Sequence, residues 1–166
     1  MMISVRITLF PTAAQRRELQ AMEQVGRGLR EGFVTRLDQR EQSWPLPLSK
    51  QAGHLPEAMI EAAMKQARRI HQAPQSHSQQ HRIPVPWLWK RSEFQLADNQ
   101  LHVYPLKEAI YYIAPVAQRR QMRLGTPVRL RICRDEQTWT AILCLWRADE
   151  KKPAKPVQSK SMWLKT

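Results

Sequence analysis

The chain has 166 residues, the length of one domain or of one barrel with a helical insertion, and it can bury a core without disulfide bonds. Its 27 Lys and Arg outnumber its 14 Asp and Glu, leaving a formal net charge of +13. This charge argues against an enzyme for cationic substrates and favours a polyanionic partner, nucleic acid before a membrane surface. No segment reaches the roughly 20 apolar residues of a membrane span, and Arg6 interrupts the N-terminal apolar residues, so we expect a cytoplasmic protein without a signal peptide.

The N-terminal part of the sequence predicts one strand followed by a long helix. Residues 2–10 alternate apolar and polar side chains, which is the period of a half-buried strand, and Pro11 ends it. Thr12 and Gln15 have the spacing of a capping box at a helix start. The apolar stripe of this helix continues to about residue 42 and includes Gly26, which indicates a close approach of another segment.

A second helix is expected after a loop. Residues 43–55 contain Pro and Gly and predict the loop, and Pro56 is well placed to open a helix that reaches about His71. Residues 72–86 are rich in Gln, His, Ser and Pro. Because such a composition buries little apolar surface, we expect these residues to form a mobile connector.

The C-terminal part of the sequence returns to the period of strands. A turn is expected at residues 97–100, between two short strands, and another at residues 134–137. The candidate strands lie at residues 94–96, 101–104, 109–114, 128–133 and 139–146.

Between Ala109 and Arg134 the sequence has six Arg and no acidic residue. Arg129 and Arg131 share one strand face, opposite Val128, Leu130 and Ile132, and such a surface can follow a phosphate backbone. Tyrosines near these cations are candidates for stacking on bases. The nucleic-acid-binding candidates here are Arg119, Arg120, Arg123, Arg129, Arg131, Arg134, Tyr111 and Tyr112.

Arginines on the two expected helices are weaker candidates, because acidic residues are interleaved with them on the first helix. Contacts to a duplex backbone position a protein without reading sequence. The helical candidates are Arg16, Arg17, Arg27, Arg30, Arg68 and Arg69.

Several motifs resemble the TnpB family of insertion-sequence accessory proteins. The segment Ile7–Gln15, ITLFPTAAQ, resembles that family's opening strand and its Tyr/Phe-Pro-Thr-x-x-Gln motif. Further along, Gly26-Arg27 lies at the position where members of that family commonly have a Gly or Cys followed by Arg. Phe94–Leu101 resembles a hairpin before the last barrel strands. Leu124–Val128, followed by Trp139-x-Ala141, resembles the closing hairpin.

The resemblance implies an α+β fold like that of TnpB and the related type V CRISPR effectors. In these proteins the first strand joins later strands in a wedge-like, OB-like antiparallel β-barrel, which a helical recognition insertion interrupts. Here the barrel would comprise residues 1–11 and 87–147, and the insertion, of about two long helices, residues 12–86. Residues 148–166 would be a basic flexible tail. A lone first strand must in any case find partners downstream.

The RuvC nuclease of that family is expected to be missing. Its cleavage requires several carboxylates that hold divalent metals, the first on a Gly-Ile-Asp-x-Gly strand soon after the barrel. Here Trp146 is followed by RADEKK, in which Asp149 and Glu150 are expected to end a solvated turn. We therefore expect no catalytic residues and no cofactor.

A metal site is not expected from the histidines or the cysteines. His77 and His81 have half of a zinc-finger spacing, but no Cys-x-x-Cys accompanies them. Cys133 and Cys144 lie on different candidate strands and are expected to be buried, reduced thiols.

Three functions remain open. The first is a non-catalytic subunit that binds structured RNA, of guide or CRISPR type, in a ribonucleoprotein whose other proteins supply cleavage or targeting. The second is a DNA-binding transposon accessory or transcriptional regulator that acts through the helices, although the loop at residues 43–55 is longer than the turn of a helix-turn-helix. The third is a scaffold that contacts proteins within a ribonucleoprotein.

Overall fold

A computed structural model describes residues 1–39, 53–73 and 81–148. Seven antiparallel strands form one sheet in the order β2-β6-β7-β1-β5-β4-β3. The expectations for residues 40–52, for the histidine at position 77 and for the tail from residue 149 lie outside these residues. The strands are β1 (Met2–Phe10), β2 (Trp87–Lys90), β3 (Phe94–Ala97), β4 (Gln100–Val103), β5 (Ile110–Ile113), β6 (Thr126–Asp135) and β7 (Thr138–Trp146).

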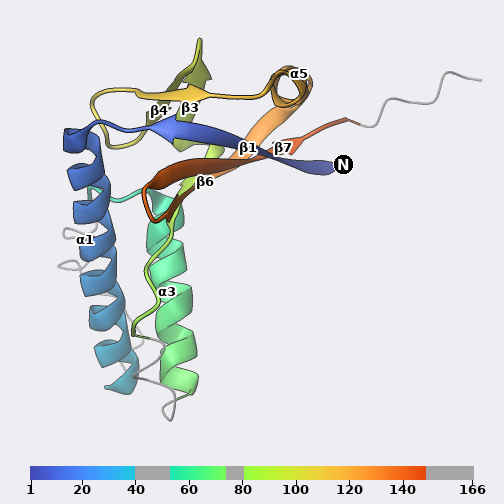
Figure 1. The fold of residues 1–166 in the computed structure, drawn as a ribbon. Coiled ribbons are helices and arrows are strands. Elements are labelled where there is room, and N and C mark those ends of the chain that lie inside the picture. Colours follow the sequence, from blue (N-terminus) through green and yellow to red (C-terminus); the bar gives the residue numbers. More distant parts are fainter. Residues whose placement is uncertain (40–52, 74–80, 149–166) are drawn as a thin grey trace, which may run out of the picture.

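The first strand completes the sheet, as expected. β1 pairs with β7 from Met2 opposite Trp146 to Leu9 opposite Trp139, and on its other side with β5 at residues 8–10. The two end strands of the sheet, β2 and β3, follow one another through a short 3-10 helix, η2 (Arg91–Glu93). The sheet is therefore curled into a nearly closed barrel, and the predicted α+β fold with a small antiparallel barrel is confirmed (Figure 1).

Alternation along the strands fills the barrel. In β1 the side chains of Val5, Ile7 and Leu9 are buried, whereas the intervening side chains are exposed. The same alternation buries Leu143 and Leu145 in β7. Because neighbouring side chains of a strand point to opposite faces, the apolar set of each strand lies inside and the polar set outside.

The long helix α1 (Ala13–Asp38) begins at the predicted capping box. The main-chain N–H of Gln15 donates to Thr12 Oγ1 (3.2 Å), and that of Thr12 donates to Gln15 Oε1 (2.9 Å). The buried Gln15 amide also donates to the carbonyls of Glu108 and Ala109 (3.2 and 2.9 Å), just before β5. One side chain therefore caps the helix and attaches it to the barrel.

Helix α3 (Glu57–Gln72) lies beside α1, and both extend away from the barrel (Figure 1). Pro56 precedes its first residue, close to the predicted start. The faces that meet contain Leu29 and Phe33 from α1 and Met59 and Ala63 from α3, all buried. None of the helices in the described ranges is long and apolar enough to span a membrane.

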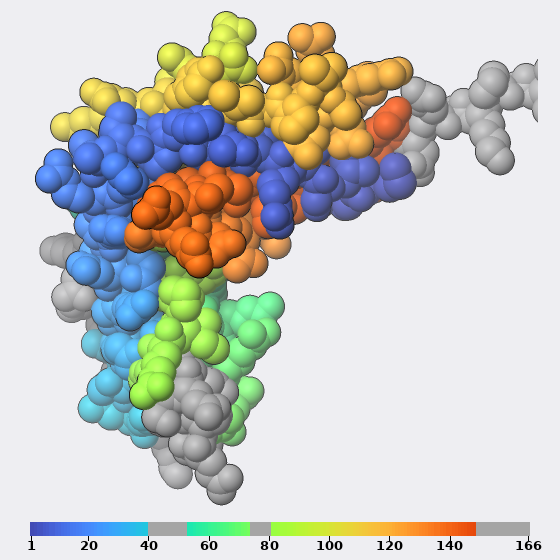
Figure 2. All heavy atoms as spheres, viewed as in Figure 1, coloured from blue at the N-terminus to red at the C-terminus, as the bar shows by residue number. Residues whose placement is uncertain are grey.

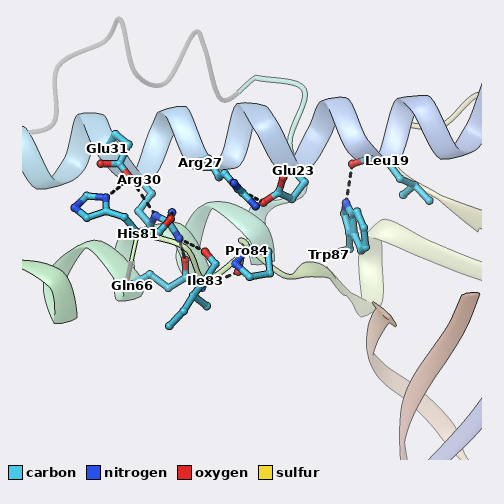
Figure 3. Close-up of polar contacts among 10 residues, drawn as sticks. All are labelled: Leu19, Glu23, Arg27, Arg30, Glu31, Gln66, His81, Ile83, Pro84 and Trp87. Atoms are coloured by element: carbon cyan, nitrogen blue, oxygen red, sulfur yellow. Dashed lines mark hydrogen bonds and ion pairs between the residues drawn. The ribbon is translucent and has the colours of Figure 1, made fainter. Parts of the chain in front are cut away.

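Residues 81–86 correct the expectation of a mobile connector for their part of residues 72–86, of which residues 74–80 lie outside the described ranges. Residues 81–86 return towards the barrel packed against both helices, and Val85 is buried. Arg30, fully buried, donates to the carbonyls of His81 (2.9 Å) and Ile83, and Gln66 of α3 donates to the carbonyl of Pro84 (3.2 Å) (Figure 3). The side chain that orders this polar segment comes from another element, so the composition of the segment itself did not reveal it.

A third helix, α5 (Val116–Leu124), was not predicted. It has nine residues and none of them is buried. Met122 packs partly against the core, and α5 lies over one end of β1 and β6 (Figure 1).

Candidate nucleic-acid interface

The outward side of four neighbouring strands carries cations and exposed aromatic rings. β1, β5 and β7 contain no acidic residue, and the only acid of β6 is Asp135, at its end. We call this surface the arginine face. Its members are Ser4, Arg6, Thr8 and Phe10 of β1, Arg129, Arg131 and Cys133 of β6, Thr140, Ile142 and Cys144 of β7, and Tyr111 and Ile113 of β5.

Strand register aligns the arginines of this face. Arg131 of β6 lies opposite Ile142 of β7, which in turn lies opposite Arg6 of β1. Neighbouring strands are about 4.8 Å apart, so Arg131 and Arg6 are about 10 Å apart at the backbone. The side chains of Arg6, Arg129 and Arg131 are exposed and make no hydrogen bond or ion pair with other described residues. Their guanidinium groups are free to meet an anion. Figure 2 shows β1 on the surface between α5 and the β6–β7 hairpin.

The expected pattern in β6 needs one correction. Leu130 and Ile132 are buried, but Val128 is 39% exposed. The register between β6 and β7 shifts between Pro127 and Arg129. A bulge adds a residue to one strand, so the alternation is interrupted at Val128 and is regular again from Arg129 to Ile132.

Of the two predicted tyrosines, only Tyr111 faces outward. Its ring is 50% exposed and lies 5.9 Å, between centroids, from the equally exposed ring of Phe10. Phe10 was not among the predicted site residues, although the period of β1 already places it on the same side as Arg6. Tyr112 points inside and is 7% exposed, so its assignment as a stacking residue is wrong. Burial, followed by the charge of Asp98, raises the pKa of the Tyr112 phenol.

The arginines of α5 lie on a helix that contacts one end of β1 and β6, and not on the strands of the arginine face themselves. Arg120 is exposed. Arg119 donates from Nε to the carbonyl of Ala114 (2.8 Å). Arg119 and Arg123 line a cavity of about 450 Å³ at the end of the barrel, together with Asp98 and Tyr112.

The helical candidates separate into three environments. Arg16 and Arg17 are exposed at the start of α1, beside the barrel, whereas Arg68 and Arg69 are exposed near the far end of α3 (Figure 1). Arg30 is fully buried, so its predicted role as a phosphate contact is wrong. Its guanidinium group donates hydrogen bonds to the side-chain oxygen of Gln66 (2.8 Å) and to two main-chain carbonyls.

Arg27, Arg131 and Arg134 meet where α1 adjoins the end of β6. All three line a groove of about 380 Å³. Arg27 is paired with Glu23 of the preceding turn (2.5 Å). The guanidinium of Arg134 lies 5.5 Å from the centre of the Trp139 ring, a cation–π distance. Arg27 is about 100 residues away from Arg131 and Arg134 in the sequence, and only the fold brings it to them.

Lys90 lies on β2, which pairs with β6, but its ammonium group is already engaged in ion pairs and is not free to bind a phosphate. Its ammonium lies 2.7 Å from a carboxylate oxygen of Glu61 and 3.0 Å from one of Glu57, both on α3. These two hydrogen bonds raise the pKa of Lys90. The lysine therefore links the helix to the barrel.

Within the described ranges, no three His, Cys, Asp or Glu side chains gather as a metal site. The ring of His81 contacts Glu31 of α1, with Nδ1 2.7 Å from Oε1. Cys133 and Cys144 are free thiols, but both are only half-buried on the arginine face, which corrects their expected burial.

No protein-family model matches the chain, and no curated protein matches it. The resemblance to TnpB therefore stays a prediction.

Proposed function

We propose that the protein binds structured RNA through the arginine face, without catalysing a reaction. The observation that carries the proposal is that the exposed side chains of Arg6 on β1 and of Arg129 and Arg131 on β6 lie on either side of β7, without a partner among the described residues, and that the only acid of these three strands is Asp135 at the end of β6. Nothing in that face offsets the positive charge, so a phosphate backbone lying across it is neutralised and releases counterions.

The mixture of groups on this face favours RNA with accessible bases over a uniform duplex. Phe10 and Tyr111 offer two exposed rings at one end of the face, and unpaired bases stack on such rings. A duplex backbone alone makes no use of exposed rings. Loops and single-stranded ends of a folded RNA use both the rings and the arginines.

A role in an RNA-guided ribonucleoprotein, with other proteins supplying cleavage or targeting, is the specific form of this proposal. It rests on the resemblance to TnpB together with the barrel, which β1 completes after a helical insertion. A helix-turn-helix regulator is less favoured, because its helices cross at about 90–120°, whereas α1 and α3 lie side by side (Figure 1).

The test compares a labelled RNA hairpin with an unpaired loop, a duplex DNA of equal length and a single-stranded RNA, each at 50 and 200 mM salt. We expect the hairpin to bind most tightly and all affinities to fall with salt. Equal, weak binding to the three would overturn the RNA proposal. Preferential binding to the duplex DNA would favour the regulator instead.

The scaffold alternative is tested separately, by purifying the tagged protein from its host with and without nuclease. We expect nuclease treatment to release the bound material. A defined protein partner retained after complete nuclease digestion would favour the scaffold.

A further inference from the structure

The groove at the junction of barrel and helices has a built apolar wall. It lies between α1, the segment Pro84–Trp87 and the end of β6, and Figure 3 shows Pro84 and Trp87 below the helix face that carries Glu23 and Arg27. The indole N–H of Trp87 donates to the carbonyl of Leu19 of α1 (2.7 Å). The Trp87 ring also lies 5.4 Å from that of Trp139, between centroids. The wall is thus fixed before any ligand arrives.

The segment that forms this wall is fixed at its other end as well. Val85 sits against Gly26, where an added Cβ would come 3.1 Å from a methyl carbon of Val85. Arg30 holds the carbonyls of residues 81 and 83. A preformed surface loses less entropy on binding than a mobile segment does.

The remaining sides of the groove are charged. Arg131 and Arg134 come from β6 and Arg27 from α1, and Glu23 is the one acid in the lining. The side chain of Arg131 has no hydrogen-bond or ion-pair partner among the described residues. Arg134 donates from Nε to the carbonyl of Glu136 (3.2 Å) and spreads over Trp139. The groove therefore combines an apolar, partly aromatic wall with guanidinium groups and one carboxylate acceptor.

We propose that this groove binds a single unpaired nucleotide, with its base against the Pro84–Trp87 wall and its phosphate at Arg131 and Arg134. An inorganic phosphate would leave the apolar wall uncovered, and an apolar ligand would leave the three guanidinium groups without an anionic partner. The carboxylate of Glu23 supplies an acceptor for a base amino group. This assignment rests on the proposed function, because Arg131 belongs to both the groove and the arginine face. A bound RNA can pass from the face into the groove at that residue.

The test uses two RNA hairpins that share the same stem and loop, one blunt and one with a single unpaired nucleotide at its end. Fluorescence anisotropy measures both against the full chain. We expect the extended hairpin to bind about fivefold to 100-fold more tightly, the contribution of one stacked base. Adenosine 5′-monophosphate, titrated by calorimetry, tests whether the groove takes a free nucleotide instead.

Gln20→Trp is the blocking variant, because Gln20 is exposed on α1 and lines the groove. Val25→Trp is the matched control, since Val25 is 42% exposed and lies on the opposite side of the same helix. We expect Gln20→Trp to abolish the advantage of the extended hairpin while leaving the blunt hairpin unaffected. Val25→Trp should preserve the advantage.

The outcomes separate the two proposals. Equal binding of both hairpins to the wild type, with no monophosphate binding, overturns the groove and leaves RNA binding by the arginine face intact. Saturable monophosphate binding that Gln20→Trp removes, without a preference between hairpins, assigns the groove to a free nucleotide. Failure of every RNA to bind overturns the proposed function, and the monophosphate titration then decides the groove alone.

Discussion

A Cβ atom placed on Gly26 of α1 would lie 3.1 Å from Cγ1 of Val85, in a segment 59 residues further along the chain. Two positions later, a Cβ atom placed on Gly28 would have no neighbouring atom within 4 Å. The two glycines stand in one helix, but only Gly26 makes room for the returning segment. They form a matched pair for stability measurements.

We predict that Gly28→Ala stabilises the protein by about 1 kcal/mol, because alanine is the better helix former and meets nothing. Gly26→Leu should destabilise it by about 2 kcal/mol or more, since Val85 is 1% exposed and cannot move aside freely. Urea unfolding followed by circular dichroism measures both. Similar shifts for the two variants would contradict the contact between Gly26 and Val85.

Arg30 is predicted to be structural. Arg30→Met keeps much of the side-chain volume but leaves the carbonyls of His81 and Ile83 without their donor, which should lower the free energy of unfolding by about 2–3 kcal/mol. The control is Arg27→Met, whose exposed pair with Glu23 should contribute less than about 1 kcal/mol. A loss as small as that of the control would show that solvent satisfies these carbonyls.

The arginine face is tested away from the groove with the double variant Arg6→Gln/Arg129→Gln. We predict roughly a tenfold loss of affinity for the RNA hairpin and a salt slope lower by about 2, one for each lost phosphate contact. Arg68→Gln/Arg69→Gln removes the same charge from the far end of α3 and should bind nearly as the wild type does. If both double variants lose equally, net charge alone drives binding.

Adjacent tyrosines provide a test of stacking. Tyr111→Ala should weaken binding of RNA with unpaired bases by about fivefold to 100-fold, with a small change in stability, because its ring is half exposed. Tyr112→Ala should lower stability by about 3–5 kcal/mol, because its ring is in the core. Fluorescence anisotropy and thermal unfolding of both variants separate the two roles. A loss of RNA affinity in Tyr112→Ala and a loss of stability in Tyr111→Ala would contradict the assignment of Tyr111 to the surface and Tyr112 to the core.

The raised pKa of Tyr112 gives a pH prediction. The neutral phenol is the form that the folded state favours, so its contribution to stability is complete below pH 10, the ordinary value, and is lost as the pH rises through the folded pKa. Absorbance of the phenolate should show one transition above pH 10 that Tyr112→Phe removes. Asp98→Asn should lower that pKa, since the carboxylate disfavours a second negative charge nearby. An unchanged titration in Asp98→Asn would mean that burial alone raises the pKa.

Local sequence signals identified the elements that carry their own signature. The capping box of Thr12 and Gln15 marked the start of α1, and the alternation in residues 2–10 marked β1, because both are set by neighbours in the chain. Helix α5 was not predicted; it has only nine residues, and none of them is buried. The exposure of Val128 was not predicted, because the register shift beside it is a property of two paired strands.

The sequence by itself determined six of the seven barrel strands, all but β2, together with the two long helices, the net positive charge and the scarcity of acids on β1, β5, β6 and β7, because periodicity and composition act over a few residues at a time. Tertiary structure alone decided which arginines are available. Arg30 looked like its neighbours on α1, yet it is buried under a segment about 50 residues away, and Arg27 meets Arg131 and Arg134 only across the barrel junction. Burial and charge clustering depend on contacts between distant segments, which no local pattern encodes.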